Sequence, residues 1–130
     1  MKIVVVDTDI WVDFFRGKKE LLEELWKRQL EGKIRVAMSV VTVMELLTGK
    51  TGKKDEKVLL GMMEELKVIP VDYRLARFAG ESKRGKKINI ALADYLIGMT
   101  AVFVKGYLVT RNKKHFEGIE GLKLLEIGGK

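Results

Sequence analysis

Several kinds of chemistry are excluded by what this sequence lacks. It contains no cysteine among its 130 residues, so it can form no disulfide, no thiol nucleophile and no cysteine-ligated zinc site. Its only histidine is His115, which excludes a metal site built from several histidines. The longest apolar run, residues 88–104, is too short to cross a bilayer and carries Asp94. We therefore expect no membrane-spanning helix.

The residues that are present are typical of one globular domain. Apolar residues make up 47% of the chain, and 130 residues can bury a core without covalent cross-links. We find no internal repeat and no linker-like stretch, so we expect a single domain over residues 1–130. No secretory leader precedes the first strand-like segment, which predicts a cytoplasmic protein. The net charge of +7 favours a polyanionic partner, although lysine-rich surfaces are also common in heat-adapted proteins.

Three acidic residues stand alone inside apolar segments. Asp7 ends a strand-like run. Glu45 is the only charged residue in segment 36–49, and Asp94 is the only one in segment 88–104. An ionised carboxylate in apolar surroundings needs a cation or a charged partner, or it takes up a proton. Each residue alone is explained as a helix cap or the partner of a distant lysine, but three together favour a site for Mg²⁺ or Mn²⁺, which prefer oxygen ligands.

Strand-like and helix-like segments alternate along the chain. Short β-branched runs predict strands near residues 2–6, 34–38, 67–71, 107–110 and 122–126. Apolar residues at helical spacing predict helices near residues 10–16, 21–31, 40–48, 53–66, 73–84 and 90–104. Asp9 and Ser39 precede two of these helices and are expected to cap them. This alternation predicts an α/β fold in which helices cover both faces of a parallel sheet.

The acidic residues fall at consistent places in such a fold. In parallel sheets, ligands bind beyond the carboxyl ends of the strands, at the point where the strand order reverses. Asp7 follows the first predicted strand, and Asn112 comes shortly after a later one. Glu45 and Asp94 lie on predicted helices that can pack against the same edge. We therefore expect one site at this edge of the sheet.

Four segments of the chain resemble motifs of the PIN-domain family, most closely the VapC-type toxins. They are VVDTDIWVDFFRG at 5–17, SVVTVMELLTG at 39–49, ADYLIG at 93–98 and LVTRNKKHFEGI at 108–119. The resemblance covers essentially the whole chain, in the same order and spacing. It implies a three-layer α/β/α sandwich with a central parallel sheet and an endoribonuclease that depends on Mg²⁺ or Mn²⁺. It also implies an RNA substrate, a homodimer, and a VapB-like antitoxin that holds the enzyme inactive.

The resemblance also implies roles for particular residues. The acidic residues of the family carry over onto Asp7, Glu45 and Asp94, which would hold the metal. The fourth acidic position of the family is Asn112 here, which we count with Asp7, Glu45 and Asp94 as a candidate catalytic residue. Its amide oxygen can ligate a metal or a metal-bound water, but it brings no charge. We therefore expect one firmly held metal and only a weak second one. A carboxylate-bound metal would activate water for attack on the RNA phosphodiester, so that no nucleophilic side chain is needed.

Several neighbouring residues are candidates for supporting roles. The hydroxyls of Thr8, Ser39 and Thr110 are candidates for orienting the carboxylates, and a helix cap or a turn explains Thr8 and Ser39 equally well. Asp9 is interpreted as a helix cap that could also act through water. His115 is interpreted as structural or RNA-contacting. The apolar residues of the first two helices, Trp11, Phe14, Phe15 and Trp26, exceed the needs of a small core, and we expect some of them to form a dimer surface.

Three other interpretations stay open on the sequence alone. A phosphatase of the haloacid dehalogenase type has an Asp-x-Asp motif after its first strand, which Asp7 and Asp9 match. However, Trp11 stands where that motif has Thr or Val, and such enzymes usually need a longer chain. A phosphoreceiver domain would leave Glu45 unexplained. A degenerate PIN domain that binds RNA or protein without cleavage is favoured by one feature, Asn112.

Overall fold

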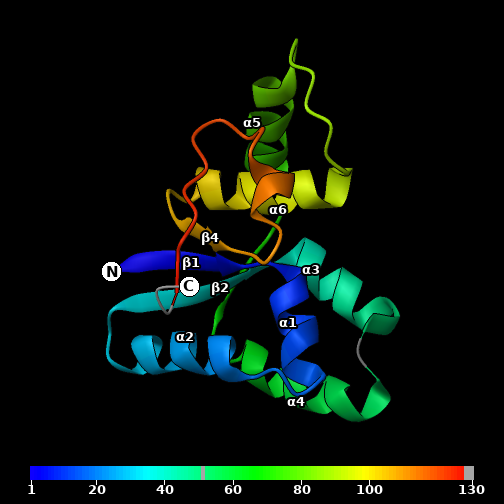
Figure 1. The fold of residues 1–130 in the computed structure, drawn as a ribbon. Helices are drawn as coiled ribbons and strands as arrows, with labels where there is room; N and C mark the ends of the chain where they lie inside the picture. Colours follow the sequence, from blue (N-terminus) through cyan, green and yellow to red (C-terminus); the bar gives the residue numbers. More distant parts are fainter. Residues whose placement is uncertain (51, 128–130) are drawn as a thin grey trace.

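A four-stranded parallel sheet forms the centre of the molecule (Figure 1). The structure is a computed structural model and describes residues 1–50 and 52–127. The strand order is β3-β2-β1-β4, and every neighbouring pair is parallel. The strands are β1 (Lys2–Val6), β2 (Ile34–Ser39), β3 (Lys67–Ile69) and β4 (Tyr107–Val109).

Helices cover both faces of this sheet, as predicted. Figure 1 shows α2 and α4 on one face and α5 and α6 on the other, with α1 descending from the end of β1. The helical segments are α1 (Thr8–Phe15), α2 (Glu20–Leu30), α3 (Val40–Glu45), η1 (Leu46–Lys50), α4 (Lys53–Met63), α5 (Tyr73–Lys83), α6 (Leu92–Phe103) and η2 (Lys113–Phe116). The predicted three-layer α/β/α sandwich is therefore confirmed. No helix in the described part of the chain is both long and apolar enough to cross a membrane.

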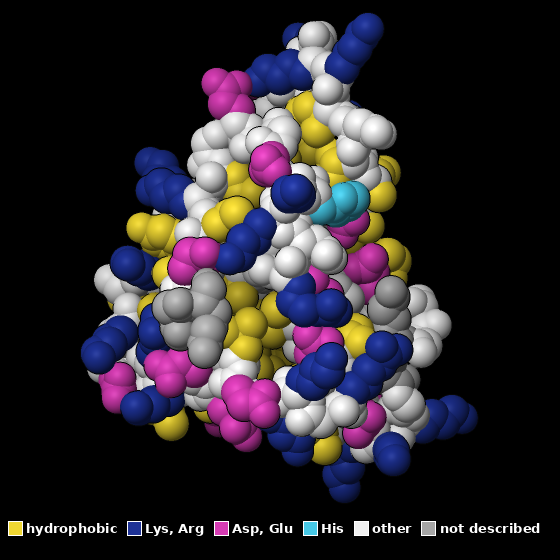
Figure 2. Space-filling model, viewed as in Figure 1, with side chains coloured by type: hydrophobic (Ala, Val, Ile, Leu, Met, Phe, Trp, Pro, Cys, Tyr) yellow, Lys and Arg dark blue, Asp and Glu magenta, His cyan; other side chains and the backbone are white. Residues whose placement is uncertain are grey.

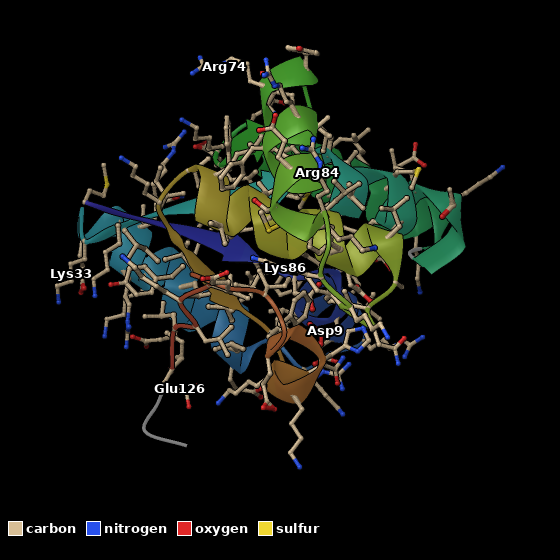
Figure 3. The ribbon with its side chains drawn as sticks, turned by 90° about the horizontal axis from the view of Figure 1, so that it is seen from above. Asp9, Lys33, Arg74, Arg84, Lys86 and Glu126 are labelled. Atoms are coloured by element: carbon tan, nitrogen blue, oxygen red, sulfur yellow. The ribbon has the colours of Figure 1, made fainter. Side chains whose placement is uncertain are left out.

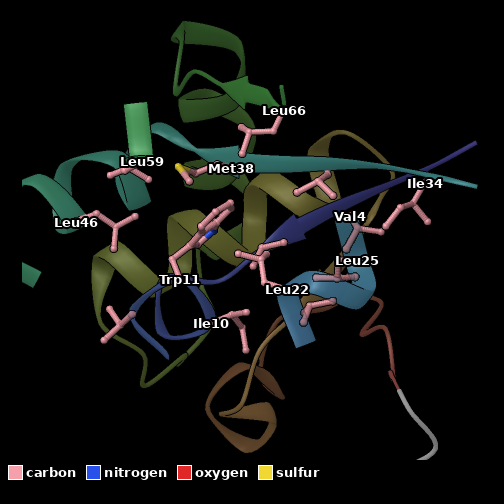
Figure 4. Close-up of a cluster of buried hydrophobic side chains, with 14 residues drawn as sticks. Val4, Ile10, Trp11, Leu22, Leu25, Ile34, Met38, Leu46, Leu59 and Leu66 are labelled. Carbon is pink, nitrogen blue, oxygen red and sulfur yellow. The ribbon is translucent and has the colours of Figure 1, made fainter. Parts of the chain in front are cut away.

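Two apolar clusters hold the three layers together, one on each face of the sheet. Because side chains alternate along a strand, Val4 and Val6 enter one cluster and Val5 enters the other. Figure 4 shows the first cluster, in which the fully buried Trp11 packs among aliphatic side chains from α2, β2 and α4. Burying each large apolar side chain contributes about 1.5–3 kcal/mol, so these two clusters are the main support of the sheet.

Close backbone packing brings β4 against β1. A Cβ atom added to Gly106 would lie 2.5 Å from the carbonyl oxygen of Ile3, so a larger residue there would push β4 away. Beyond the paired residues, the backbone N–H of Asp7 donates to the carbonyl oxygen of Val109 at 2.9 Å. The chain passes from β1 to β2 and β3 on one side, and then to β4 on the other side of β1. The strand order thus reverses between β1 and β4.

Some local predictions were wrong. Asp7, not Asp9, caps α1, because its extended backbone directly follows β1 and its carboxylate accepts from the N–H of Thr8. The predicted strand near 122–126 is reduced to a single bridge between Leu108 and Leu124. The helix predicted over 40–48 leaves α-helical geometry at Leu46 and continues as a π-helical segment. Helix and strand propensities depend on the local sequence. They do not include the neighbouring strand at the sheet edge or the positive φ of Gly49, which alter these ends.

Candidate active site

The three carboxylates singled out in the sequence line one open pocket at the carboxyl end of the sheet. Asp7 lies at the junction of β1 and α1, Glu45 ends α3, and Asp94 lies in the first turn of α6. The remaining lining residues are Thr8, Asp9, Val12, Arg16, Gly49, Arg111 and Asn112. The pocket is beside the point where the strand order reverses, which is where α/β sheets bind ligands.

Asp7 is the most deeply buried acid of the pocket, with only 4% of its surface exposed. Its Oδ1 accepts from the N–H of Thr8 at 2.8 Å, and its Oδ2 accepts from the hydroxyl of Thr110 at 2.7 Å. Burial, and after it the nearby charge of Asp9, raise the pKa of Asp7 to about 7, against the lowering effect of the two hydrogen bonds. A cation bound beside Asp7 would favour its charged form and lower this pKa.

Glu45 is held by a relay of two threonine hydroxyls. Thr8 Oγ1 donates to Glu45 Oε1 at 2.6 Å, and the hydroxyls of Thr8 and Thr42 lie 2.9 Å apart. Because the single proton of Thr8 is given to Glu45, Thr42 must be the donor to Thr8. Sequence reasoning missed Thr42, although it precedes Glu45 by three residues and such residues share a helix face.

The other predicted hydroxyls have different surroundings. Thr110 contacts Asp7 and in turn accepts from the backbone N–H of Asn112 at 3.0 Å. Ser39 caps α3, where its hydroxyl accepts from the N–H of Val41 at 3.0 Å. In the described part of the chain, no hydrogen bond joins Ser39 to a carboxylate of the pocket. Ser39 therefore acts on the site only by fixing the start of the helix that carries Glu45.

Asp94 is paired with the only histidine of the chain. His115 Nε2 lies 2.8 Å from Asp94 Oδ2, and its ring packs edge-on against Phe116. Figure 2 shows this histidine beside acidic side chains, with Lys and Arg side chains around them. The sequence interpretation of His115 did not include this contact, since the two residues are 21 positions apart and belong to different elements.

Asp9 occupies the wall between Asp7 and the segment after β4. Its Oδ2 accepts from the backbone N–H of Arg111 and from the side-chain amide of Asn112, both at 3.2 Å. Burial raises the pKa of Asp9, and the nearby Arg111 guanidinium partly offsets this. The same guanidinium forms a closer ion pair with Asp13, at 2.7 Å. Asp9 is thus a half-buried member of the pocket rather than a helix cap.

The oxygen atoms that line the pocket are of the type that binds a hard divalent cation. The pocket presents four carboxylates and the amide of Asn112, and Asp9 Oδ1 is buried without a hydrogen-bond partner among the described residues. In residues 1–50 and 52–127, no three acidic or histidine side chains could hold a metal ion as they stand. Glu45 and Asp94 are directed toward Thr8 and His115, so ion binding would require these side chains to shift.

The chain belongs to the PIN-domain family, whose model matches residues 4–122. It is 32% identical over 128 residues to Ribonuclease VapC1 of Methanocaldococcus jannaschii. The aligned region covers 95% of this chain and 87% of that protein. This relationship confirms the resemblance to VapC proteins that the four sequence motifs indicated. A phosphatase of the haloacid dehalogenase type is not favoured by any of these matches.

Several solved structures with the same fold are toxin–antitoxin complexes. VapBC2 from Rickettsia felis, bound to a DNA fragment from its promoter, superimposes with a TM-score of 0.78 at 24% identity, covering 95% of this chain and 97% of that one. A toxin–antitoxin complex from Klebsiella pneumoniae gives a TM-score of 0.70 at 28% identity, covering 92% and 94%. The fold and strand topology described above are therefore those of VapC-like PIN domains.

Proposed function

We propose that this protein is a metal-dependent endoribonuclease, the toxin of a VapBC-type pair, and that it hydrolyses RNA phosphodiester bonds in the cytoplasm as a single domain. The observation that carries the proposal is the meeting of Asp7, Glu45 and Asp94 in one pocket at the reversal of strand order. The 32% identity to a ribonuclease of the VapC type supports the same reaction. The chain offers no cysteine as a nucleophile and no second histidine for an acid–base pair.

The proposed ligands of Mg²⁺ or Mn²⁺ are Asp7, Glu45 and Asp94. When bound, the ion would supply a water of lowered pKa and would neutralise charge that develops on the phosphate. Hydrogen bonds fix the orientation of two of these carboxylates. The Thr110 hydroxyl and the N–H of Thr8 donate to Asp7, and the Thr8 hydroxyl donates to Glu45. Such outer contacts typically change metal affinity or activity by 10–100-fold.

Basic side chains near the pocket are suited to the RNA backbone. Arg16 and Arg111 line the pocket itself, and Lys113 and Lys114 follow in the next segment. Together with the net charge of +7, they would bind phosphates without regard to sequence. RNA affinity should therefore fall steeply as salt is added.

The proposed protein partners are a VapB-like antitoxin and a second copy of the chain. An antitoxin that places an Arg or Lys in the acidic pocket would exclude the metal, because both require the same carboxylates. A separate surface, the apolar groove, lies between α2 and α4 and is lined mainly by Phe14, Leu22, Trp26, Leu30, Val58 and Met62. Its shape and composition suit an amphipathic helix of a protein partner.

The structure narrows the set of aromatic residues that could form the expected dimer surface. Trp11 is fully buried in the first core cluster and cannot contact a second chain. Phe14 and Trp26 do line the apolar groove. Phe15 is half-buried like Phe14 but does not line the groove, so Phe14 and Trp26 are the predicted aromatic residues that lie in it.

The decisive experiment is a cleavage assay on total cellular RNA with and without divalent ions. We expect cleavage with Mg²⁺ or Mn²⁺, none in EDTA, and recovery when the ion is added back. RNA binding without cleavage at any ion concentration would instead favour the degenerate PIN domain. Cleavage that persists in EDTA would contradict the metal-dependent mechanism.

A further inference from the structure

The segment that carries His115 is fixed against α6 by buried apolar contacts. Phe116 and Ile119 pack on Gly98, where an added Cβ atom would lie 2.5 Å from Ile119 Cδ1 and 3.3 Å from Phe116 Cδ1. Gly98 and Asp94 are one helical turn apart, so they lie on the same face of α6. The close packing at Gly98 therefore sets the imidazole of His115 beside the carboxylate of Asp94, with Nε2 at 2.8 Å from Oδ2.

The hydrogen bond between these two side chains is open to exchange. The side chain of His115 is 43% exposed and that of Asp94 is 31% exposed, so water reaches both partners. A carboxylate offers only acceptors when it is ionised, which places the shared proton on Nε2. A cation that binds Asp94 competes with the imidazole for this carboxylate. His115 is therefore the side chain that loses its partner when the acidic pocket is loaded.

A second open pocket adjoins the acidic pocket on the side of His115. It is lined by Asp94, Asn112, Lys114 and His115, and the first two of these residues also line the acidic pocket. Within the described residues, Lys114 forms no ion pair. An ammonium group and an imidazole N–H thus border one open space next to the proposed site of cleavage. These are donors that suit a phosphate group.

We propose that His115 binds a backbone phosphate of the RNA beside the scissile one, and that Asp94 keeps its imidazole from the RNA until the cation is bound. This inference rests on the proposed metal-dependent function. Without a cation, the carboxylate of Asp94 occupies Nε2 and repels a phosphate. A bound cation offsets that charge and frees the imidazole for the pocket that it shares with Lys114. The ion and the RNA would then strengthen each other's binding.

The main test is His115→Phe, which keeps an aromatic ring next to Phe116 but removes both ring nitrogens. Isothermal titration calorimetry measures Mn²⁺ affinity. Fluorescence anisotropy measures binding of a short single-stranded RNA with phosphorothioate linkages, whose integrity is checked on a gel. We expect Mn²⁺ to bind about threefold to tenfold more tightly, because no hydrogen bond to Asp94 has to be broken. We expect RNA to bind about tenfold more weakly with Mn²⁺ and equally well in EDTA.

Two controls accompany this variant. His115→Gln keeps an N–H donor on a side chain of similar reach, and it should stay within about threefold of the parent in both measurements. Lys114→Met should weaken RNA binding with Mn²⁺ at least about threefold more than Lys33→Met, which removes the same charge. Figure 3 shows Lys33 at the opposite end of the sheet from Asp9, which lines the acidic pocket. Thermal unfolding in EDTA checks that each variant is folded.

The possible outcomes separate this inference from the proposed function. Unchanged or weaker Mn²⁺ binding in His115→Phe would overturn the competition between the imidazole and the cation. An equal loss of RNA affinity with Mn²⁺ and in EDTA would overturn the holding role of Asp94, and equal effects of Lys114→Met and Lys33→Met would overturn the phosphate site. In each case, a parent protein that cleaves RNA with Mn²⁺ keeps the proposed function. A parent protein that binds neither Mn²⁺ nor RNA would reject both.

Discussion

The acidic pocket and the apolar groove differ in what each leaves exposed to a partner. The pocket gathers four carboxylates, of which Asp7 has its pKa raised by burial and Asp9 keeps one oxygen without a donor. The groove instead leaves apolar side chains in water, with Leu30 81% exposed and Val58 51% exposed. The first arrangement suits a cation and a polyanion, and the second suits a protein chain. Groove variants should therefore leave RNA cleavage unchanged.

The largest effect is expected from the acidic pocket. Asp94→Asn removes a proposed ligand and keeps the shape of the side chain, and it should lower RNA cleavage by more than about 100-fold, since even the outer contacts of a ligand are worth 10–100-fold. Cleavage is measured on purified protein with Mn²⁺, and the groove variant Leu30→Glu should match the parent. Retained cleavage in Asp94→Asn would remove this residue from the site.

The second prediction concerns the pH dependence of stability without metal. The pKa of Asp7 is raised to about 7 in the folded protein, above its ordinary value of 3.8, so the folded state holds this proton more tightly than the unfolded state. The resulting stabilisation is full below about pH 4 and is lost as the pH rises to about 7. At 1.36 kcal/mol per pKa unit, the loss is at most about 4 kcal/mol.

Urea denaturation in EDTA at pH 5 and pH 8 measures the part of this loss that falls above pH 5, about 2 to 3 kcal/mol. The parent should be less stable at pH 8, and Asp7→Asn should be less sensitive to pH because an amide does not titrate in this range. Added Mn²⁺ should restore the stability of the parent at pH 8 by binding the folded state. If Asp7→Asn keeps the full pH dependence of the parent, the effect belongs to another group.

The third prediction concerns the apolar groove. Leu30→Glu places a charge where we expect an apolar partner side chain, and it should weaken antitoxin binding by roughly 30-fold, about 2 kcal/mol, the size of a typical hot-spot loss. Leu60→Glu is the control, since Leu60 is an exposed apolar residue of α4 that does not line the groove. Surface plasmon resonance with the cognate antitoxin compares the two. Equal binding by both variants would separate the groove from this partner.

The smallest effect is expected from the hydroxyl relay behind Glu45. Thr42→Val removes the hydroxyl that donates to Thr8, and it should weaken Mn²⁺ binding by about tenfold. Thr48→Val is the matched control, because the Thr48 hydroxyl donates to the main-chain oxygen of Glu45 and not to its carboxylate. Calorimetry on the two variants measures the difference. An equal loss in both would show that the relay does not act through the carboxylate.

The sequence predicted the architecture because its signals are local and repeated. The β-branched run ending at Val6 had to form a buried strand, and its alternation with amphipathic helices favoured a parallel sheet covered on both faces. Parallel strands end at one edge, so the placement of Asp7, Glu45 and Asp94 in one pocket also followed from their positions in the chain. Element ends were less predictable, because the cap at Asp7 depends on where β1 stops.

The sequence by itself thus determined the family, the layers and three of the four acids that lie in the pocket. Only the tertiary structure decided what each acid contacts. His115 meets Asp94, Thr42 supports Glu45 through Thr8, and Asn112 holds Asp9, all through contacts between elements distant in the chain. The physical reason is that secondary structure follows from neighbouring residues, whereas a hydrogen bond across more than 100 residues depends on how whole elements pack.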